Sequence, residues 1–146
     1  MGNICRSPVV EAVARSEFRR AGLEIAVGSA GTEDYHQGEG ADPRAIASAA
    51  AAGYDASAHR ARQVVVADFT RFDALLVMDR VNLRALARHA PAQTRAHVGL
   101  FLEFAGMAPP HEVPDPYYGD ARDFAAVIAL ARAGIQGLIG RCGNAA

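Results

Sequence analysis

The first eight residues combine backbone flexibility, a positive charge and the start of a helix in one short stretch. Gly2 and Asn3 tolerate positive φ angles, so the backbone there can curl and turn successive N–H groups inward. Ser7 and Pro8 suit the N-cap and the first turn of a helix, and Arg6 supplies a forked guanidinium. Inward amides, a helix N-terminus and this guanidinium together suit a phosphate dianion. An ordinary capped helix start is the alternative that these residues leave open.

A second candidate for chemistry is Asp115, which lies between two prolines in the loop Val113–Gly119. A carboxyl group that acts as a general acid must lie within hydrogen-bond reach of the leaving oxygen and be held protonated. A proline-stiffened loop beside a phosphate site can supply both conditions. Asp-Pro is also common in simple turns, which is the structural alternative. The two cysteines, Cys5 and Cys142, make neither a disulfide framework nor a metal site.

Composition places these residues in one globular domain. The chain has 146 residues, half of them apolar, and a formal net charge of −1. All 15 basic residues are arginine, but the near-zero net charge argues against a nucleic-acid-binding protein. No apolar run approaches the ~20 residues of a membrane span and no secretory signal is present, so we expect a cytoplasmic protein.

The periodicity of apolar residues predicts alternating helices and strands. Helical spacing, capping residues and helix-stop glycines predict helices over residues 8–21, 42–52, 79–89 and 120–141, with a single turn at Asp68-Phe69. Compact apolar runs predict strands over 23–30, 73–78 and 95–100. The four prolines between Met107 and Gly119 predict a loop.

Helix and strand alternation indicates an α/β fold with an open, mostly parallel sheet and helices on both faces. In such a sheet, ligands bind beyond the carboxyl ends of the strands, where loops feed the next helix. The loops at residues 1–7, 29–40 and 79 all fall at such ends. A loop like that of residues 1–7 needs a strand before it, so we expect a four-stranded sheet whose first, central strand precedes Met1.

The N-terminal stretch resembles the phosphate-binding loop of the low-molecular-weight protein tyrosine phosphatases, whose pattern is Cys-x5-Arg-Ser with Gly-Asn-x-Cys inside it. The resemblance continues in family order to the end of the chain, at Ser29-Ala30-Gly31-Thr32, His59–Gln63, Met78-Asp79 and the loop of Asp115. It implies a metal-free, cofactor-free hydrolysis of phosphomonoesters through a cysteinyl-phosphate intermediate, on phosphotyrosine-containing proteins or small aryl phosphates.

The resemblance also implies a role for each site residue. Arg6 would bind the equatorial phosphate oxygens, and Asp115 would protonate the leaving phenolate. The remaining residues divide into a phosphate- and substrate-binding group, namely Gly2, Asn3, Ile4, Cys5, Ser7, Tyr35 and Tyr117, and a pair that supports the loop, namely Ser29 and His59. Three of these residues would have more specific roles. His59 would orient Asn3, Ser7 would lower the pKa of the nucleophilic thiol, and Cys5 would be the redox partner of that thiol.

The nucleophile of the pattern falls six residues before Arg6, immediately before Met1. Cys5 cannot replace it, because Cys5 is adjacent to Arg6 and the residue six positions after Cys5 is Glu11. We therefore expect residues 1–146 to be a single, N-terminally truncated domain that is inactive as written. Met1 would then be an internal methionine, with a cysteine codon directly upstream and an apolar strand before it.

Three alternatives stay open. Arsenate reductases share the loop but need further redox cysteines, and the only other cysteine here is Cys142. Protein-arginine phosphatases tend to have threonine where this chain has Ile4. A non-catalytic phosphate-binding remnant is the third. In all cases we expect a monomer that binds neither nucleic acid nor membrane.

Overall fold

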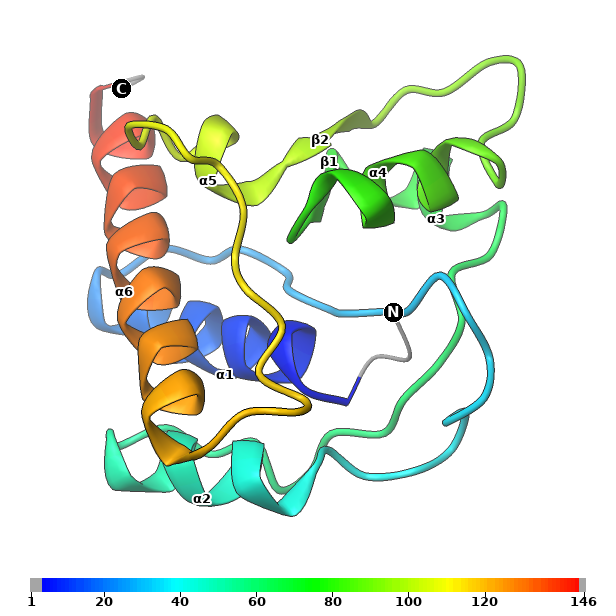
Figure 1. The fold of residues 1–146 in the computed structure, drawn as a ribbon. Helices are drawn as coiled ribbons and strands as arrows, with labels where there is room; N and C mark the ends of the chain where they lie inside the picture. Colours follow the sequence, from blue (N-terminus) through cyan, green and yellow to red (C-terminus); the bar gives the residue numbers. More distant parts are fainter. Residues whose placement is uncertain (1–3, 145–146) are drawn as a thin grey trace.

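The computed structural model describes residues 4–144, and its helices surround a small parallel sheet (Figure 1). In chain order the elements are α1 (Arg6–Arg20), α2 (Pro43–Ala51), α3 (Asp68–Arg71), β1 (Ala74–Val77), α4 (Arg80–Ala87), β2 (His97–Leu100), α5 (Phe101–Phe104) and α6 (Ala121–Asn144). The mixed α/β class and the parallel sheet are thus as predicted. Gly2 and Asn3 lie outside the described residues.

Local capping explains the helices whose starts the sequence predicted well. Asp42 caps α2 by accepting a hydrogen bond from the Arg44 amide at 2.8 Å, and Asp79 caps α4 by accepting one from the Asn82 amide at 2.8 Å. Gly22, with a φ of 73°, follows the C-cap of α1 as predicted.

The start of α1 differs from the prediction. Its N-cap residue is Cys5, and the helix begins at Arg6, so Ser7 lies inside the first turn and does not cap it. Pro8 is accommodated there because the first-turn amides of a helix have no carbonyl partner within the helix, so the missing N–H costs nothing.

The described sheet has two strands, whereas the sequence predicted that three of the four strands would lie within this chain. Strand β1 pairs with β2 in parallel from Ala74 opposite His97 to Val77 opposite Leu100. The predicted strand over residues 23–30 is absent, and only an isolated bridge joins Gly31 to Gln63 nearby. A strand exists only when a neighbour pairs with its backbone, and no described segment lies in ladder register with residues 23–30.

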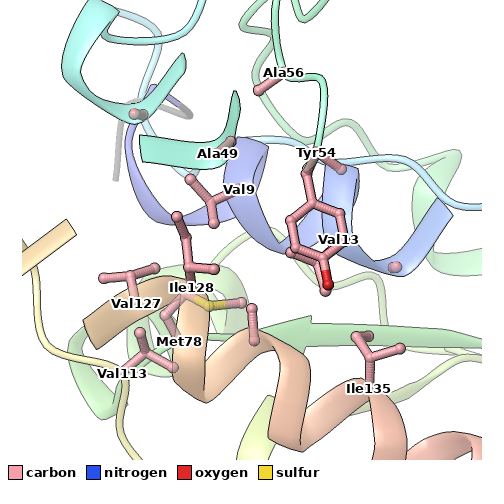
Figure 2. Close-up of a cluster of buried hydrophobic side chains, with 14 of the residues drawn as sticks. Val9, Val13, Ala49, Tyr54, Ala56, Met78, Val113, Val127, Ile128 and Ile135 are labelled. Atoms are coloured by element: carbon pink, nitrogen blue, oxygen red, sulfur yellow. The ribbon is translucent and has the colours of Figure 1, made fainter. Parts of the chain in front are cut away.

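Helices cover both faces of β1, as predicted. On one face, side chains of α1, α2 and α6 form the larger hydrophobic cluster with Met78 and Val113 (Figure 2). On the other face, Val64, Phe69 and Leu86 form a smaller cluster against Leu75 and Val77. Alternate residues of β1 therefore point to the hydrophobic clusters on opposite faces of the sheet, as in a parallel strand that is buried on both sides.

Helix α6 corrects one expectation from the sequence. Its segment Ala121–Cys142 is long and apolar enough to cross a membrane by length and composition, although no such run was expected. The helix instead packs along α1 and α2, and one face is buried through Phe124, Val127, Ala131 and Ile135. A core helix of a water-soluble domain has the same appearance.

Candidate active site

One cavity of about 310 Å³ collects residues from the beginning and the end of the chain. The loop between α5 and α6 passes across the N-terminal end of α1 before it enters α6, and this brings the two regions together (Figure 1). Of the residues predicted to act on a substrate, those that line the cavity are Ile4, Cys5, Arg6, Ser7, Tyr35, Asp115 and Tyr117.

Arg6 is the centre of this cavity and is held by a set of buried contacts. Its guanidinium is only 5% exposed. Nη1 donates to Asp79 Oδ2 at 2.7 Å and to the Val113 carbonyl at 2.8 Å, and Nη2 donates to Asn82 Oδ1 at 3.2 Å. Among the described residues none accepts a hydrogen bond from Nε. The Nε–Nη2 edge is the edge with which arginine binds two oxygens of a phosphate.

Asp79 and Asn82 were not predicted as partners of Arg6. The sequence predicted Asp79 as the cap of α4, and the same carboxylate both caps that helix and binds the guanidinium. Burial by itself would raise the pKa of Asp79, but hydrogen bonds from Arg6 and the Asn82 amide, and the positive charge of Arg6, lower it below its ordinary value. Asp79 is therefore ionised near neutral pH, and its carboxylate fixes the orientation of the Arg6 side chain.

Asp115 faces Arg6 across the cavity. Its Oδ2 lies 3.9 Å from Arg6 Nη2, and the side chain is 47% exposed. The loop is anchored just before it, because the Val113 amide donates to the Met78 carbonyl at 2.8 Å and Glu112 accepts from the Arg80 amide at 2.8 Å. The carboxyl group of Asp115 thus lies at the cavity edge, with solvent on one side and the guanidinium on the other.

Two tyrosines flank the same cavity, as the sequence predicted. Tyr35 is 61% exposed and Tyr117 is 37% exposed. Tyr118 also lines the cavity, at an edge-to-face contact with Tyr117 whose ring centroids are 4.9 Å apart. Partly exposed rings at a cavity mouth offer an apolar surface to an aromatic group.

Cys5 is chemically unsuited to be a nucleophile. Burial, together with the nearby negative charges of Asp42 and Asp115, raises the pKa of its thiol to about 12. Its Sγ donates to Asp42 Oδ2 at 3.8 Å. The thiolate is the reactive form of cysteine, so this thiol reacts poorly near neutral pH. The spacing of Cys5 and Arg6 in the sequence had already excluded Cys5 as the nucleophile.

Ser29 and His59 lie together, but in a different cavity of about 260 Å³. Both contact Glu11 of α1, to which Ser29 Oγ donates, while His59 Nδ1 lies 3.4 Å from Glu11 Oε2. Burial would raise the pKa of Glu11, but these two partners and Arg15 lower it. The predicted contact of His59 with Asn3 falls outside the described residues. The sequence did not predict Glu11 as the shared partner of Ser29 and His59. The only signal for such a role was its position one helical turn after Ser7.

The described part of the chain has no group of three or more His, Cys, Asp or Glu side chains arranged to hold a metal ion. The lining of the cavity at Arg6 supplies the guanidinium of Arg6, the carboxyl group of Asp115 and the N-terminal end of α1. Together these groups can bind a tetrahedral dianion and transfer a proton beside it.

Comparisons with known proteins identify the family of the chain. Residues 1–144 match the family model described as low molecular weight phosphotyrosine protein phosphatase. A low molecular weight protein-tyrosine-phosphatase of Streptomyces coelicolor is 42% identical over 143 residues, which are 94% of this chain and 87% of that protein.

Solved structures give the same result for the fold. A protein tyrosine phosphatase from Entamoeba histolytica superposes with a TM-score of 0.91 at 34% identity, over 99% of this chain and 94% of that one. Wzb of Vibrio vulnificus in complex with benzylphosphonate superposes with a TM-score of 0.84 at 29% identity, over 97% and 93%. The chain belongs to the low molecular weight phosphotyrosine protein phosphatase family.

Proposed function

We propose that this protein hydrolyses phosphotyrosine monoesters, with Arg6 binding the phosphoryl group and Asp115 acting as the general acid. The observation that carries the proposal is that these two side chains, from opposite ends of the sequence, face one cavity with Oδ2 and Nη2 3.9 Å apart. A guanidinium fixed by buried partners is preorganised for an anion, and this lowers the free energy of a transition state in which charge spreads over the phosphoryl oxygens.

The reaction would proceed in two steps. A cysteine thiolate, which the family pattern places six residues before Arg6, attacks phosphorus as the P–O bond to the phenol breaks. Asp115 gives its proton to the leaving phenolate oxygen. In the second step the Asp115 carboxylate takes a proton from water, whose oxygen attacks the phosphocysteine and releases inorganic phosphate and the thiolate.

The two tyrosines support an aromatic substrate. The rings of Tyr35 and Tyr117 both line the cavity, so a phenyl phosphate would place its ring between them and its phosphate against Arg6. A structural neighbour, Wzb of Vibrio vulnificus, was solved with benzylphosphonate, which joins an aromatic ring to a phosphonate. The shorter phosphoserine would bring no ring to this surface, which favours phosphotyrosine.

The first test concerns the nucleophile. The codon immediately upstream of Met1 is expected to encode cysteine, and residues 1–146 alone are expected to show no thiol-dependent turnover of p-nitrophenyl phosphate. With the upstream residues included, turnover should appear and should survive the Cys5→Ser substitution. A non-cysteine codon at that place would contradict the proposal and leave a phosphate-binding protein. Turnover abolished by Cys5→Ser would contradict the assignment of the nucleophile to the upstream cysteine.

The second test concerns Asp115 in the protein that carries the upstream cysteine. Asp115→Asn should lower kcat/KM by about 10²-fold or more on phenyl phosphate, whose leaving group needs a proton, and much less on p-nitrophenyl phosphate. Asp120→Asn is a matched control, because Asp120 also follows the loop but does not line the cavity. Equal losses on both substrates for Asp115→Asn would mean that Asp115 has only a structural role.

A further inference from the structure

Arg44 has no place in the reaction as described above, yet it touches the phosphate-binding end of the molecule and the Asp115 loop at once. It lies in the first turn of α2, and it binds the capping residue Asp42 with its Nε at 3.1 Å and its Nη2 at 2.8 Å. The first cause of the lowered pKa of Asp42 is this pair of hydrogen bonds, so the carboxylate is ionised at neutral pH.

Asp42 connects Arg44 to the start of α1. The Asp42 amide donates to the Ile4 carbonyl at 2.8 Å, and Asp42 Oδ2 accepts from the Cys5 thiol at 3.8 Å. Both Ile4 and Cys5 line the cavity. The guanidinium of Arg44 is therefore fixed relative to the segment that leads into Arg6.

The Arg44 guanidinium also lies over two aromatic rings, those of Tyr117 and Phe124. Its Cζ lies 5.6 Å from the ring centroid of Tyr117 and 4.9 Å from that of Phe124. Phe124 is 1% exposed in the first turns of α6, so it is a fixed surface. Tyr117 belongs to the loop of Asp115, and both cation–π contacts fall within the distance at which such contacts are attractive.

Tyr117 in turn connects to the catalytic carboxyl group. The Tyr117 amide donates to Asp115 Oδ1 at 3.1 Å, so a displacement of Tyr117 moves the acceptor with it. The chain of contacts runs from Ile4 through Asp42 and Arg44 to Tyr117 and ends at Asp115. It joins the two halves of the candidate active site without passing through Arg6.

We propose that Arg44 is a positioning residue that holds the Asp115 loop at its working distance from the phosphate-binding segment through its stack on Tyr117. The proposal rests on the proposed function for the role of Asp115, but the contact itself can be tested without catalysis. Arg44 does not line the cavity at Arg6, and in this role it supplies no proton. Its loss should change how often the loop is in place, and should leave the chemistry of Arg6 intact.

The first experiment measures the loop directly in residues 1–146, by hydrogen exchange of the Tyr117 and Gly119 amides, which bind Asp115 Oδ1 and the Pro116 carbonyl. Arg44→Met should speed this exchange by about threefold to tenfold, the effect expected when a cation–π contact of this kind is lost. Arg132→Met is the control, since Arg132 lies 5.6 Å from the ring of Tyr54, the same distance, but far from the loop. Unchanged exchange in Arg44→Met, or an equal effect of Arg132→Met, would overturn the proposal.

A double-mutant cycle separates the stack from a general loss of stability. Tyr117→Leu and Arg44→Met should each speed loop exchange, and the double variant should be no faster than the more affected single variant. Additive effects would show that Arg44 does not act through Tyr117. Arg44→Lys retains the charge but loses the planar fork, so its loop amides should exchange at a rate between those of wild type and Arg44→Met. If Arg44→Met weakens α2, Arg44→Lys is the variant to compare with wild type.

The second experiment uses the protein with the upstream cysteine. Arg44→Met should lower kcat/KM severalfold on phenyl phosphate and little on p-nitrophenyl phosphate, and should have little further effect in an Asp115→Asn background. If Arg44 had only a structural role, Arg44→Met would lower kcat/KM equally on both substrates, and this result would count against the proposal. If the wild-type protein shows no turnover, the proposed function fails, while the exchange experiment still decides the role of Arg44.

Discussion

Cys5 and Cys142 differ in burial, and this difference decides which thiol can react. Cys5 is buried beside Asp42, with the pKa of its thiol raised to about 12, whereas Cys142 is exposed on α6. At pH 7 a thiol with that pKa is ionised in about one molecule in 10⁵. Cys5 is therefore expected to be the less reactive of the two thiols, although it is adjacent to Arg6.

We expect iodoacetamide at pH 7.5 to alkylate Cys142 at least about 100-fold faster than Cys5, because the raised pKa of Cys5 leaves little of that thiol ionised and because Cys142 is exposed whereas Cys5 is buried. Peptide mass spectrometry over a time course measures both rates in the same sample. Unfolding in urea is the control and should make the two rates similar. Rapid labelling of Cys5 in the folded protein would contradict the raised pKa.

Asp79 provides a pH-dependent test of how Arg6 is held. Its folded-state pKa is below the ordinary value of 3.8, so its contribution to the free energy of unfolding is complete above the unfolded-state pKa and is lost as pH falls through the folded-state pKa. Asp79→Asn retains helix capping, since asparagine is also a good N-cap, and removes only the ion pair.

At pH 7 we therefore expect Asp79→Asn to lower the free energy of unfolding by about 1–3 kcal/mol, the range for a partly buried hydrogen bond between charged groups. The difference from wild type should begin to shrink below about pH 4 and should shrink further as the pH falls through the lowered folded-state pKa of Asp79. Urea unfolding at pH 7, 4 and 2.5 measures it. A difference that stays constant with pH would mean that the ion pair with Arg6 is not its source.

At the scale of elements, close approach of α6 to α5 depends on glycines in α6. A Cβ atom on Gly137 would collide with the backbone carbonyl of Ala105, and one on Gly134 would collide with the ring of Phe101. Backbone cannot move aside as a flexible side chain can. Gly140 in the same helix has open space around it.

The different surroundings of Gly137 and Gly140 predict that Gly→Ala changes the free energy of unfolding in opposite directions at the two positions. Gly137→Ala should lower the free energy of unfolding by about 1–3 kcal/mol through overpacking. Gly140→Ala should raise it by about 0.5–1 kcal/mol, because alanine is the better helix former and nothing obstructs it. Urea unfolding of both variants measures the effects. Stabilisation by Gly137→Ala would mean that α6 does not lie this close to α5.

At the scale of the whole molecule, the segment of residues 24–30 contacts one hydrophobic cluster through Val27 and the other through Ala30, and it has no strand partner in the described chain. None of its amides donates to a backbone carbonyl of a described residue. The amide of Gly31, by contrast, donates to Arg62 O at 2.8 Å.

In residues 1–146 we therefore expect rapid hydrogen exchange of the amides from 24 to 30, as for an unpaired segment, and slow exchange across α1 and α6. NMR of the uniformly ¹⁵N-labelled protein gives the rates residue by residue. With the residues upstream of Met1 included, the same amides should become protected if a strand pairs with them. Slow exchange already in residues 1–146 would contradict the unpaired arrangement.

The sequence by itself determined the elements whose causes are local. Asp42 and Asp79 cap the helices that they were predicted to cap, Gly22 ends α1, and the apolar run before Asp79 forms β1. The likeness of the N-terminal stretch and the Asp115 loop to one phosphatase family is confirmed by the family match over residues 1–144. Capping, turn formation and motif spacing need only neighbouring residues, so they can be read without a fold.

Only the tertiary structure decided the features that depend on partners distant in the chain. Whether residues 23–30 form a strand depends on a neighbour that supplies the other half of the ladder, and no local pattern contains that information. The same holds for the partners of Arg6, which come from α4 and the Asp115 loop, and for the stack of Arg44 on Tyr117. These contacts form because packing brings α2, α4 and α6 around the start of α1, so their geometry is a property of the assembled core.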